Sequence, residues 1–220
     1  MGRVSMSLLV LVALAAMVVS APTMTAARSH HNIYRVRDEE SDVFCVGHVV
    51  ELLQWHEGRH QRAYDHEGGY RAVGAGYNLD DEKDNRRKEL EEAGLDYDKV
   101  YNGETRLNQL QISGLLVLDA QRALRRAEKN IERLRDFCCS VRAVFAEIQH
   151  SVGSAKNFPR DDLNQVIEKA ASRDWGSAAD ELQRTKWCSQ QAGKYRNRCN
   201  DHLDLVDRGC QSAHQREGCY

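Results

Sequence analysis

The residues with the clearest chemical potential lie between positions 56 and 66. His56, Glu57 and His60 fit the pattern H-E-x-x-H, and His66 follows where a longer zinc-protease signature has its third ligand. On a helix, two histidines four residues apart can share a Zn²⁺ ion while the intervening glutamate handles the water. Against this, Gly58 falls inside the required helix, and all four methionines precede the motif, so no Met-turn can follow. A zinc metalloprotease is therefore a remote alternative, and we expect neither a metal nor another cofactor.

Glu57 also suggests a different chemistry, that of a general acid. The residue closes an expected helix, and a Gly-rich segment with glycines at 68, 69, 74 and 76 follows at once. A carboxyl group at the lip of a cleft is partly desolvated, which raises its pKa and lets it hold a proton. The alternative is a solvated surface glutamate, and the spacing leaves both open.

The elements that must position these residues follow from hydrophobic periodicity. Val46, Val49, Val50 and Leu53 fall at i, i+3, i+4 and i+7, which predicts an amphipathic helix that Gly58 ends. Residues 64–77 suit a short β-hairpin. Further helices are expected from a capping box at Asn108 and Gln111, over 141–150, from 163 to 171, after an Asp174 cap, and over 194–206. The sequence therefore predicts an α+β fold that is predominantly helical, with a small hairpin lobe followed by a helical lobe.

The order of residues in both parts of the chain resembles that of phage-type lysozymes. The amino-terminal likeness is carried by Leu53, Glu57, Gly58, Ala63, Tyr64, Gly69, Val73, Gly74, Gly76, Asn78 and Leu79. The carboxy-terminal likeness is carried by Phe158, the helix from Leu163, Asp174, Trp175, Ala178, Ala179, Lys186, Trp187, Arg196 and Arg198. The resemblance covers roughly residues 46–206.

This resemblance implies a lysozyme-like fold that hydrolyses the β-1,4 bond between N-acetylmuramic acid and N-acetylglucosamine in peptidoglycan. Glu57 corresponds to the family's general acid. The family has an Asp or Cys nine residues further on and a Thr six beyond that, which handle the attacking water. This chain has His66 and Ala72 at those two positions. The alternative is therefore a catalytically impaired protein of the same fold that binds saccharide in defence or in a matrix.

Other side chains complete the expected site. A neutral His66 can serve as the base for water, and Asp65 replaces it only if the strand bulges by one residue. Tyr64, Tyr70 and Arg196 are the expected saccharide contacts, and either Arg196 or Arg198 is placed to orient Glu57.

The remaining composition concerns location and partners. An apolar run over residues 8–19 after Arg3, followed by small residues, predicts a signal peptide over 1–21, a flexible lead-in over 22–42 and a domain over 43–220. The formal charge of −2 excludes a wholly basic nucleic-acid binder, and we expect no membrane association after signal removal. The expected protein is secreted, bacteriolytic and bound to peptidoglycan or a related polysaccharide.

The cysteines support an oxidising compartment. All seven lie beyond the signal region, which predicts three disulfides and one thiol that is free or links two chains in a dimer. The adjacent Cys138 and Cys139 are not expected to bond to each other, and the connectivity stays open.

Overall fold

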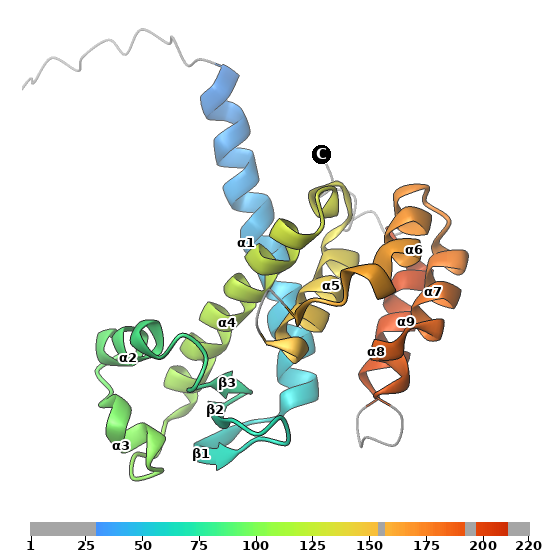
Figure 1. Ribbon diagram of the computed structural model, residues 1–220. Helices are drawn as coiled ribbons and strands as arrows, with labels where there is room; N and C mark the ends of the chain where they lie inside the picture. The colour runs from blue at the N-terminus through green and yellow to red at the C-terminus, as the bar shows by residue number, and fades with distance from the viewer. Residues whose placement is uncertain (1–29, 154–156, 192–196, 211–220) are drawn as a thin grey trace, which may run out of the picture. The chain divides into compact units, whose positions relative to one another are not determined.

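The computed structural model describes residues 30–153, 157–191 and 197–210, with side chains from residue 43 onward. The chain divides into two units, residues 1–36 and 37–220. The described residues of the first unit, 30–36, begin a helix that continues into the second unit. Its described part is mostly helical with one small antiparallel sheet (Figure 1), so the predicted α+β class is confirmed.

The helices and strands follow one another without an internal repeat. Their order is α1 (His30–Glu57), β1 (His60–Asp65), β2 (Arg71–Gly74), β3 (Tyr77–Asn78), α2 (Lys83–Glu92), α3 (Tyr97–Tyr101), α4 (Gln109–Asn130), the 3₁₀ turn η1 (Leu134–Asp136), α5 (Cys139–Val152), α6 (Arg160–Ala171), α7 (Trp175–Arg184), α8 (Lys186–Ser189) and α9 (Arg198–Arg208).

The first helix is longer at its start than the sequence predicts. Residues 30–42 are helical, so the prediction of a flexible lead-in is wrong for them. This stretch has no Gly or Pro, the two residues that most disfavour helix, and so can continue α1 even without an apolar stripe. The rest of the lead-in and the predicted signal peptide lie outside the described residues. The end of α1 is as predicted, because Gly58 takes φ +73°, a conformation that suits glycine.

The expected hairpin is a three-stranded sheet in the order β1-β2-β3. Tyr64 faces Ala72 and Asp65 faces Arg71, and the pairing is irregular between His60 and Tyr64. A second tight turn leads from β2 into the two-residue strand β3, with Val73 opposite Tyr77. Gly74 and Gly76 flank this turn and both have positive φ, which explains why the segment is rich in glycine.

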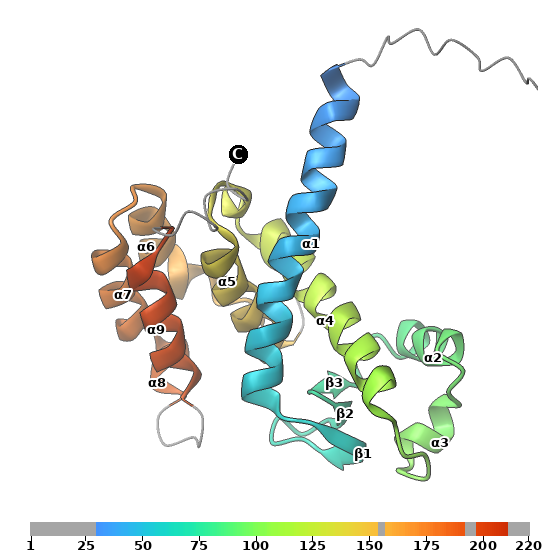
Figure 2. The ribbon, with the colours of Figure 1, turned by 180° about the vertical axis from the view of Figure 1, so that it is seen from behind.

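Helix α4 joins two hydrophobic cores. It starts with the predicted capping box, in which the side chain of Asn108 accepts from the backbone N–H of Gln111 and the Gln111 side chain accepts in return. Ile112 and Leu115 pack with the sheet, α2 and α3, whereas buried residues from Leu116 to Ala127 pack with α1 and α5. One helix therefore fixes the sheet against the helical bundle (Figure 2).

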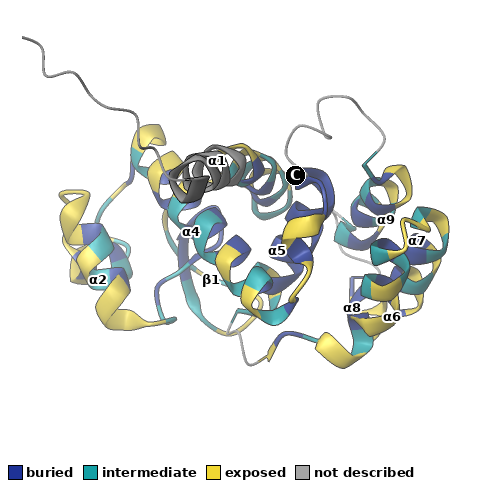
Figure 3. Cartoon of the chain, turned by 90° about the horizontal axis from the view of Figure 1, so that it is seen from above, coloured by how far each residue is buried: buried dark blue, intermediate teal, exposed yellow. Residues whose placement is uncertain are grey.

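Helix α5 is the centre of the larger core. Every residue from Cys139 to Gln149 is buried, including the charged Arg142 and Glu147, and the burial colouring shows this helix largely dark (Figure 3). Helices α6, α7 and α9 present amphipathic faces to this core. Asp174 caps α7 as predicted, through a bond from the backbone N–H of Ser177.

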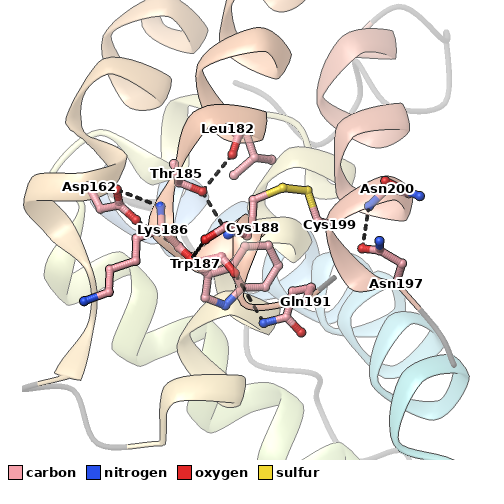
Figure 4. The surroundings of a disulfide bond; sticks show 11 residues. Asp162, Leu182, Thr185, Lys186, Trp187, Cys188, Gln191, Asn197, Cys199 and Asn200 are labelled. Atoms are coloured by element: carbon pink, nitrogen blue, oxygen red, sulfur yellow. Dashed lines mark hydrogen bonds between the residues drawn. A yellow bond between two sulfur atoms is a disulfide. The ribbon is translucent and has the colours of Figure 1, made fainter. Parts of the chain in front are cut away.

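Disulfides close three loops in the described chain. Cys45 bonds to Cys139 and Cys138 to Cys210, so the two adjacent cysteines bind partners from opposite ends of the domain. The third bond joins Cys188 on α8 to Cys199 on α9 (Figure 4). Cys219 lies outside the described residues. None of the described helices has the length and apolar character needed to cross a membrane.

Loop length predicts that these disulfides contribute differently to the free energy of unfolding. Cys45–Cys139 spans 94 residues and Cys188–Cys199 spans 11. The loop-entropy relation assigns about 4.7 kcal/mol to the longer loop and about 2.8 kcal/mol to the shorter one. We expect the C45A/C139A variant to lose about 2 kcal/mol more unfolding free energy than C188A/C199A in urea titrations. Equal losses would contradict this ranking.

Candidate active site

The carboxylate of Glu57 is the centre of the candidate site. Glu57 is the last residue of α1, and the positive φ of Gly58 turns the chain directly into β1. The side chain is only 5% exposed, so the helix end presents its carboxylate to the interior of the domain. The alternative of a solvated surface glutamate is wrong.

Three basic side chains from different elements meet Glu57. Arg198 at the start of α9 donates from Nη2 to Oε1 at 2.5 Å. His66, just after β1, lies with Nε2 3.4 Å from Oε2, and His150 near the end of α5 has Nε2 3.7 Å from Oε1. Of the two candidate arginines, Arg198 therefore orients Glu57, while Arg196 lies outside the described residues.

These contacts reverse the expected pKa shift of Glu57. Burial raises the pKa of the carboxyl, but the hydrogen bond with His66 and the positive charge of Arg198 outweigh burial and hold the pKa below its usual value. The prediction of a raised pKa is therefore wrong: it considered burial, but not the effect of His66 and Arg198 on the charge of Glu57, and it did not include His150. In this arrangement Glu57 is an ion-paired carboxylate.

Two tyrosines of the sheet lie beside the pair of Glu57 and His66. The ring of Tyr70 stacks on the His66 imidazole with centroids 4.4 Å apart. Burial, together with the negative charge of Glu57, raises the pKa of Tyr64 to about 12 and that of Tyr70 above its ordinary value. Both predicted saccharide contacts are therefore neutral hydroxyls next to the carboxylate.

Gly76 allows the turn before β3 to approach Glu57. A Cβ atom at this position would lie 2.7 Å from Glu57 Cδ, closer than real contacts allow, and φ is +72°. Glycine is required here for both space and backbone conformation.

A polar cavity of about 310 Å³ opens beside this group. Tyr70 and Gly76, from the two turns between the strands, line it opposite α4 and the carboxyl end of α5, where His150 faces both the cavity and Glu57. Its volume is near the lower end of small-molecule pockets, which begin at about 300 Å³. Its hydroxyl, amide and charged groups suit a hydrogen-bonding ligand.

An ion network forms the wall of the cavity between α2 and α4. Arg122 pairs with Asp119 and Glu89, and Arg86 donates to Asp119 at 2.6 Å. Glu89 also accepts from the Tyr77 hydroxyl at 2.5 Å. The arginines of α4 are therefore not a uniformly solvated face, because Arg122 is 13% exposed and held by carboxylates.

Other predicted residues are placed away from Glu57. The carboxylate of Asp65 is 90% exposed and accepts from Arg71 at 2.8 Å. Ala72 is wholly buried in the sheet. His60 lies on β1 with its ring 4.0 Å from that of Tyr64, beyond the end of α1. The helix that H-E-x-x-H requires is therefore interrupted between its two histidines.

Sequence reasoning missed the residues that support Glu57 from behind. His150, Glu147 and His202 lie far from residues 56–66 along the chain, and no pattern within one element joins them. One signal was visible in the sequence of α5, where the charged Glu147 lies between the apolar Ala146 and Ile148. His202, on the buried face of the mostly polar α9, gave no comparable signal.

Comparison with protein-family models gives no match to this chain, and a search of curated proteins gives no match either.

Gly76 and Gly69 provide a matched test of the contact with Glu57. Both have positive φ, but a Cβ at Gly69 has nothing within 4 Å. We expect G69A to cost about 1–3 kcal/mol of unfolding free energy from backbone strain. G76A is expected to cost more, because its methyl group also displaces the Glu57 carboxylate. Urea titration measures both, and an equal cost would show that the contact is unimportant.

The ion network between α2 and α4 should make the folding stability of the protein fall at low pH, through Glu89. Burial opposes ionisation of Glu89, but the hydrogen bonds from Tyr77 and Arg122 outweigh it and lower its pKa below 4.5. A depressed folded-state pKa gives stability that is complete above the unfolded-state value and is lost as pH falls through the folded-state value. We expect E89Q to be less stable than wild type at pH 7, and the difference to shrink below about pH 4.5. Thermal unfolding between pH 2 and 7 measures this, and a gap independent of pH would contradict it.

Proposed function

We propose that this protein is a secreted, lysozyme-like protein that binds bacterial peptidoglycan and hydrolyses its β-1,4 glycosidic bonds slowly. The observation that carries this proposal is the buried carboxylate of Glu57 beside a polar cavity between a small sheet and a helical bundle. The resemblance to phage-type lysozymes supports it, since Glu57 stands where that family has its acid. The disulfides support an extracellular location.

The arrangement of Glu57 and His66 can supply both parts of glycoside hydrolysis. One group must protonate the leaving oxygen, and another must activate water or stabilise the positive sugar. His66 Nε2 and Glu57 Oε2 are 3.4 Å apart, so a proton can pass to the carboxylate from the imidazolium form of His66, in which Nδ1 is protonated and no longer accepts from the Gly68 N–H. That transfer makes Glu57 the acid and leaves a neutral His66 able to accept a proton from water.

Tyr70 and His150 are placed to receive the sugar. Both line the cavity, and each is also linked to the reacting pair, Tyr70 by stacking on His66 and His150 by its approach to Glu57. A saccharide in the cavity therefore meets the two groups that flank the acid and the base.

A second candidate is saccharide binding without turnover. The specific observation in its favour is the direct contact of His66 with Glu57, together with Ala72, which offers no hydroxyl group. An imidazole in contact with Glu57 stands where the family has the residue that positions or activates the attacking water. Saccharide binding requires only the cavity, and it does not require a residue that activates water.

Four forms of the protein test the catalytic proposal. We expect wild type to clear cell-wall suspensions slowly and E57Q to lose about 10²- to 10⁴-fold in rate, since it cannot supply the proton. H66D should clear faster than wild type, because a carboxylate then replaces the imidazole. D65N is the matched control and should equal wild type, since Asp65 is 90% exposed and bound by Arg71.

The two candidates give different results in this assay. Hydrolysis is refuted if wild type and E57Q release soluble fragments equally across pH 4 to 8. In that case, equal sedimentation of both forms with peptidoglycan supports saccharide binding. Absence of both clearing and sedimentation would refute both candidates.

A further inference from the structure

The most completely buried group of ionisable side chains lies behind the candidate active site. His56 from α1, Glu147 from α5 and His202 from α9 have side chains with 0% exposure. His56 Nδ1 lies 2.5 Å from Glu147 Oε1, and His202 Nε2 lies 2.5 Å from Glu147 Oε2. One carboxylate thus presents each of its oxygens to a different imidazole, and the three residues come from helices that are distant along the chain.

We propose that His56, Glu147 and His202 bind one divalent transition-metal ion, Zn²⁺ in the first instance, which ties α1, α5 and α9 together. The potential ligand atoms of these three residues all lie within 4.8 Å of one another. Two imidazole nitrogens and a carboxylate are a donor set that zinc accepts in proteins. The site uses His56 but differs from the H-E-x-x-H motif, whose His60 lies beyond the end of α1.

The surroundings of His56 supply the outer shell that a metal-bound histidine needs. Its second ring nitrogen, Nε2, lies 2.8 Å from Asp201 Oδ2. A histidine that binds a metal through one nitrogen usually donates its other N–H to a carboxylate, which fixes the tautomer and the ring. Asp201 in turn accepts from the indole of Trp55 at 3.1 Å, so this outer carboxylate is itself held in place.

The ring of His202 is fixed by packing. It stacks on Trp187 with centroids 5.1 Å apart and planes 6° from parallel. Trp187 lies next to Cys188, whose disulfide to Cys199 fixes the start of α9 (Figure 4). His202 follows Cys199 by three positions, so the bond holds the turn of α9 that carries this ligand. A rigid position of this kind favours metal binding, because less order must be imposed when the ion binds.

The charge of Glu147 favours an additional cation. Its nearest guanidinium is that of Arg198, whose Nη1 is 3.7 Å from Glu147 Oε1 while Nη2 bonds to Glu57. The Arg198 guanidinium is therefore shared between two carboxylates. When His56 and His202 are neutral, as metal ligands are, the buried charge of Glu147 has only this shared guanidinium to balance it, and a divalent ion between the imidazoles supplies the rest.

The competing description is a metal-free network in which His56 carries two protons. His56 then donates to both Glu147 and Asp201, and no ion is needed. This network and the zinc site make opposite predictions for metal content, so a direct measurement separates them.

The test is zinc retention by the oxidised, full-length chain. Protein dialysed against a chelator is loaded with Zn²⁺, freed of excess metal and analysed for zinc by mass spectrometry. We expect one zinc ion per wild-type chain and a higher melting temperature than for the chelated form. Replacing zinc with Co²⁺ should give the visible absorption of a tetrahedral site with nitrogen and oxygen ligands.

Matched variants identify the ligands. E147Q and H202Q should retain no zinc, whereas H60Q and H66Q, which alter histidines of the sheet region, should retain one ion. D201N should bind about 10- to 100-fold more weakly, because only the outer shell changes. Circular dichroism shows which variants fold, and the cobalt spectrum of wild type still reports on the ligands if a variant does not.

Two results would overturn the proposal. Wild type that retains no more zinc than the chelated blank supports the proton network instead. Zinc lost from H60Q as from H202Q assigns the metal to H-E-x-x-H. These readouts are independent of glycan binding, so they stand whether or not the proposed function is correct.

Discussion

The buried carboxylate of Glu147 is the constraint around which the domain is organised. It lies on the central helix α5 with no exposure, and an uncompensated charge in such a place destabilises a fold by about 3–5 kcal/mol. Its partners come from both ends of the domain: His56 from the last turn of α1, and Arg198 and His202 from α9. Satisfying this one charge brings the first and last described helices onto the middle one.

The same constraint sets the state of Glu57. Arg198 lies between the two carboxylates and contacts both, so the group that compensates the core also holds the candidate acid in place. The arrangement fixes the direction of the Glu57 side chain, and its cost is that the resting carboxylate is ionised. The contacts that orient the Glu57 carboxylate therefore do not supply the proton that it needs to act as an acid. His66 is the group on the cavity side that connects them, since it touches Glu57 and stacks on a cavity residue.

The sequence predicted the parts of the fold that local patterns specify. The capping box at Asn108, the Asp174 cap and the glycine after α1 each depend on residues within one turn, and all three are confirmed. Helix α2 was not predicted as an element, because its sequence is almost wholly charged and it buries an arginine, Arg86, in place of an apolar residue. Residues 30–42 were mistaken for a loop for a similar reason, since an apolar stripe is absent there.

The site was predictable only along its contiguous segment. The motif around residues 56–66 identified Glu57 and His66, and the structure brings them together. The groups that decide the charge of Glu57 are up to 141 residues away, which is the separation of Arg198. Such contacts arise from packing of whole helices, and a periodic pattern in one helix carries no information about the partner in another.

The pairing of the adjacent cysteines has a consequence for resistance to proteolysis. Cys138 and Cys139 bind Cys210 and Cys45, so the two loops meet at neighbouring residues and together span residues 45–210. A protease that cuts once anywhere in this span leaves both pieces covalently joined. A single cut in a surface loop of this span therefore does not become loss of a fragment.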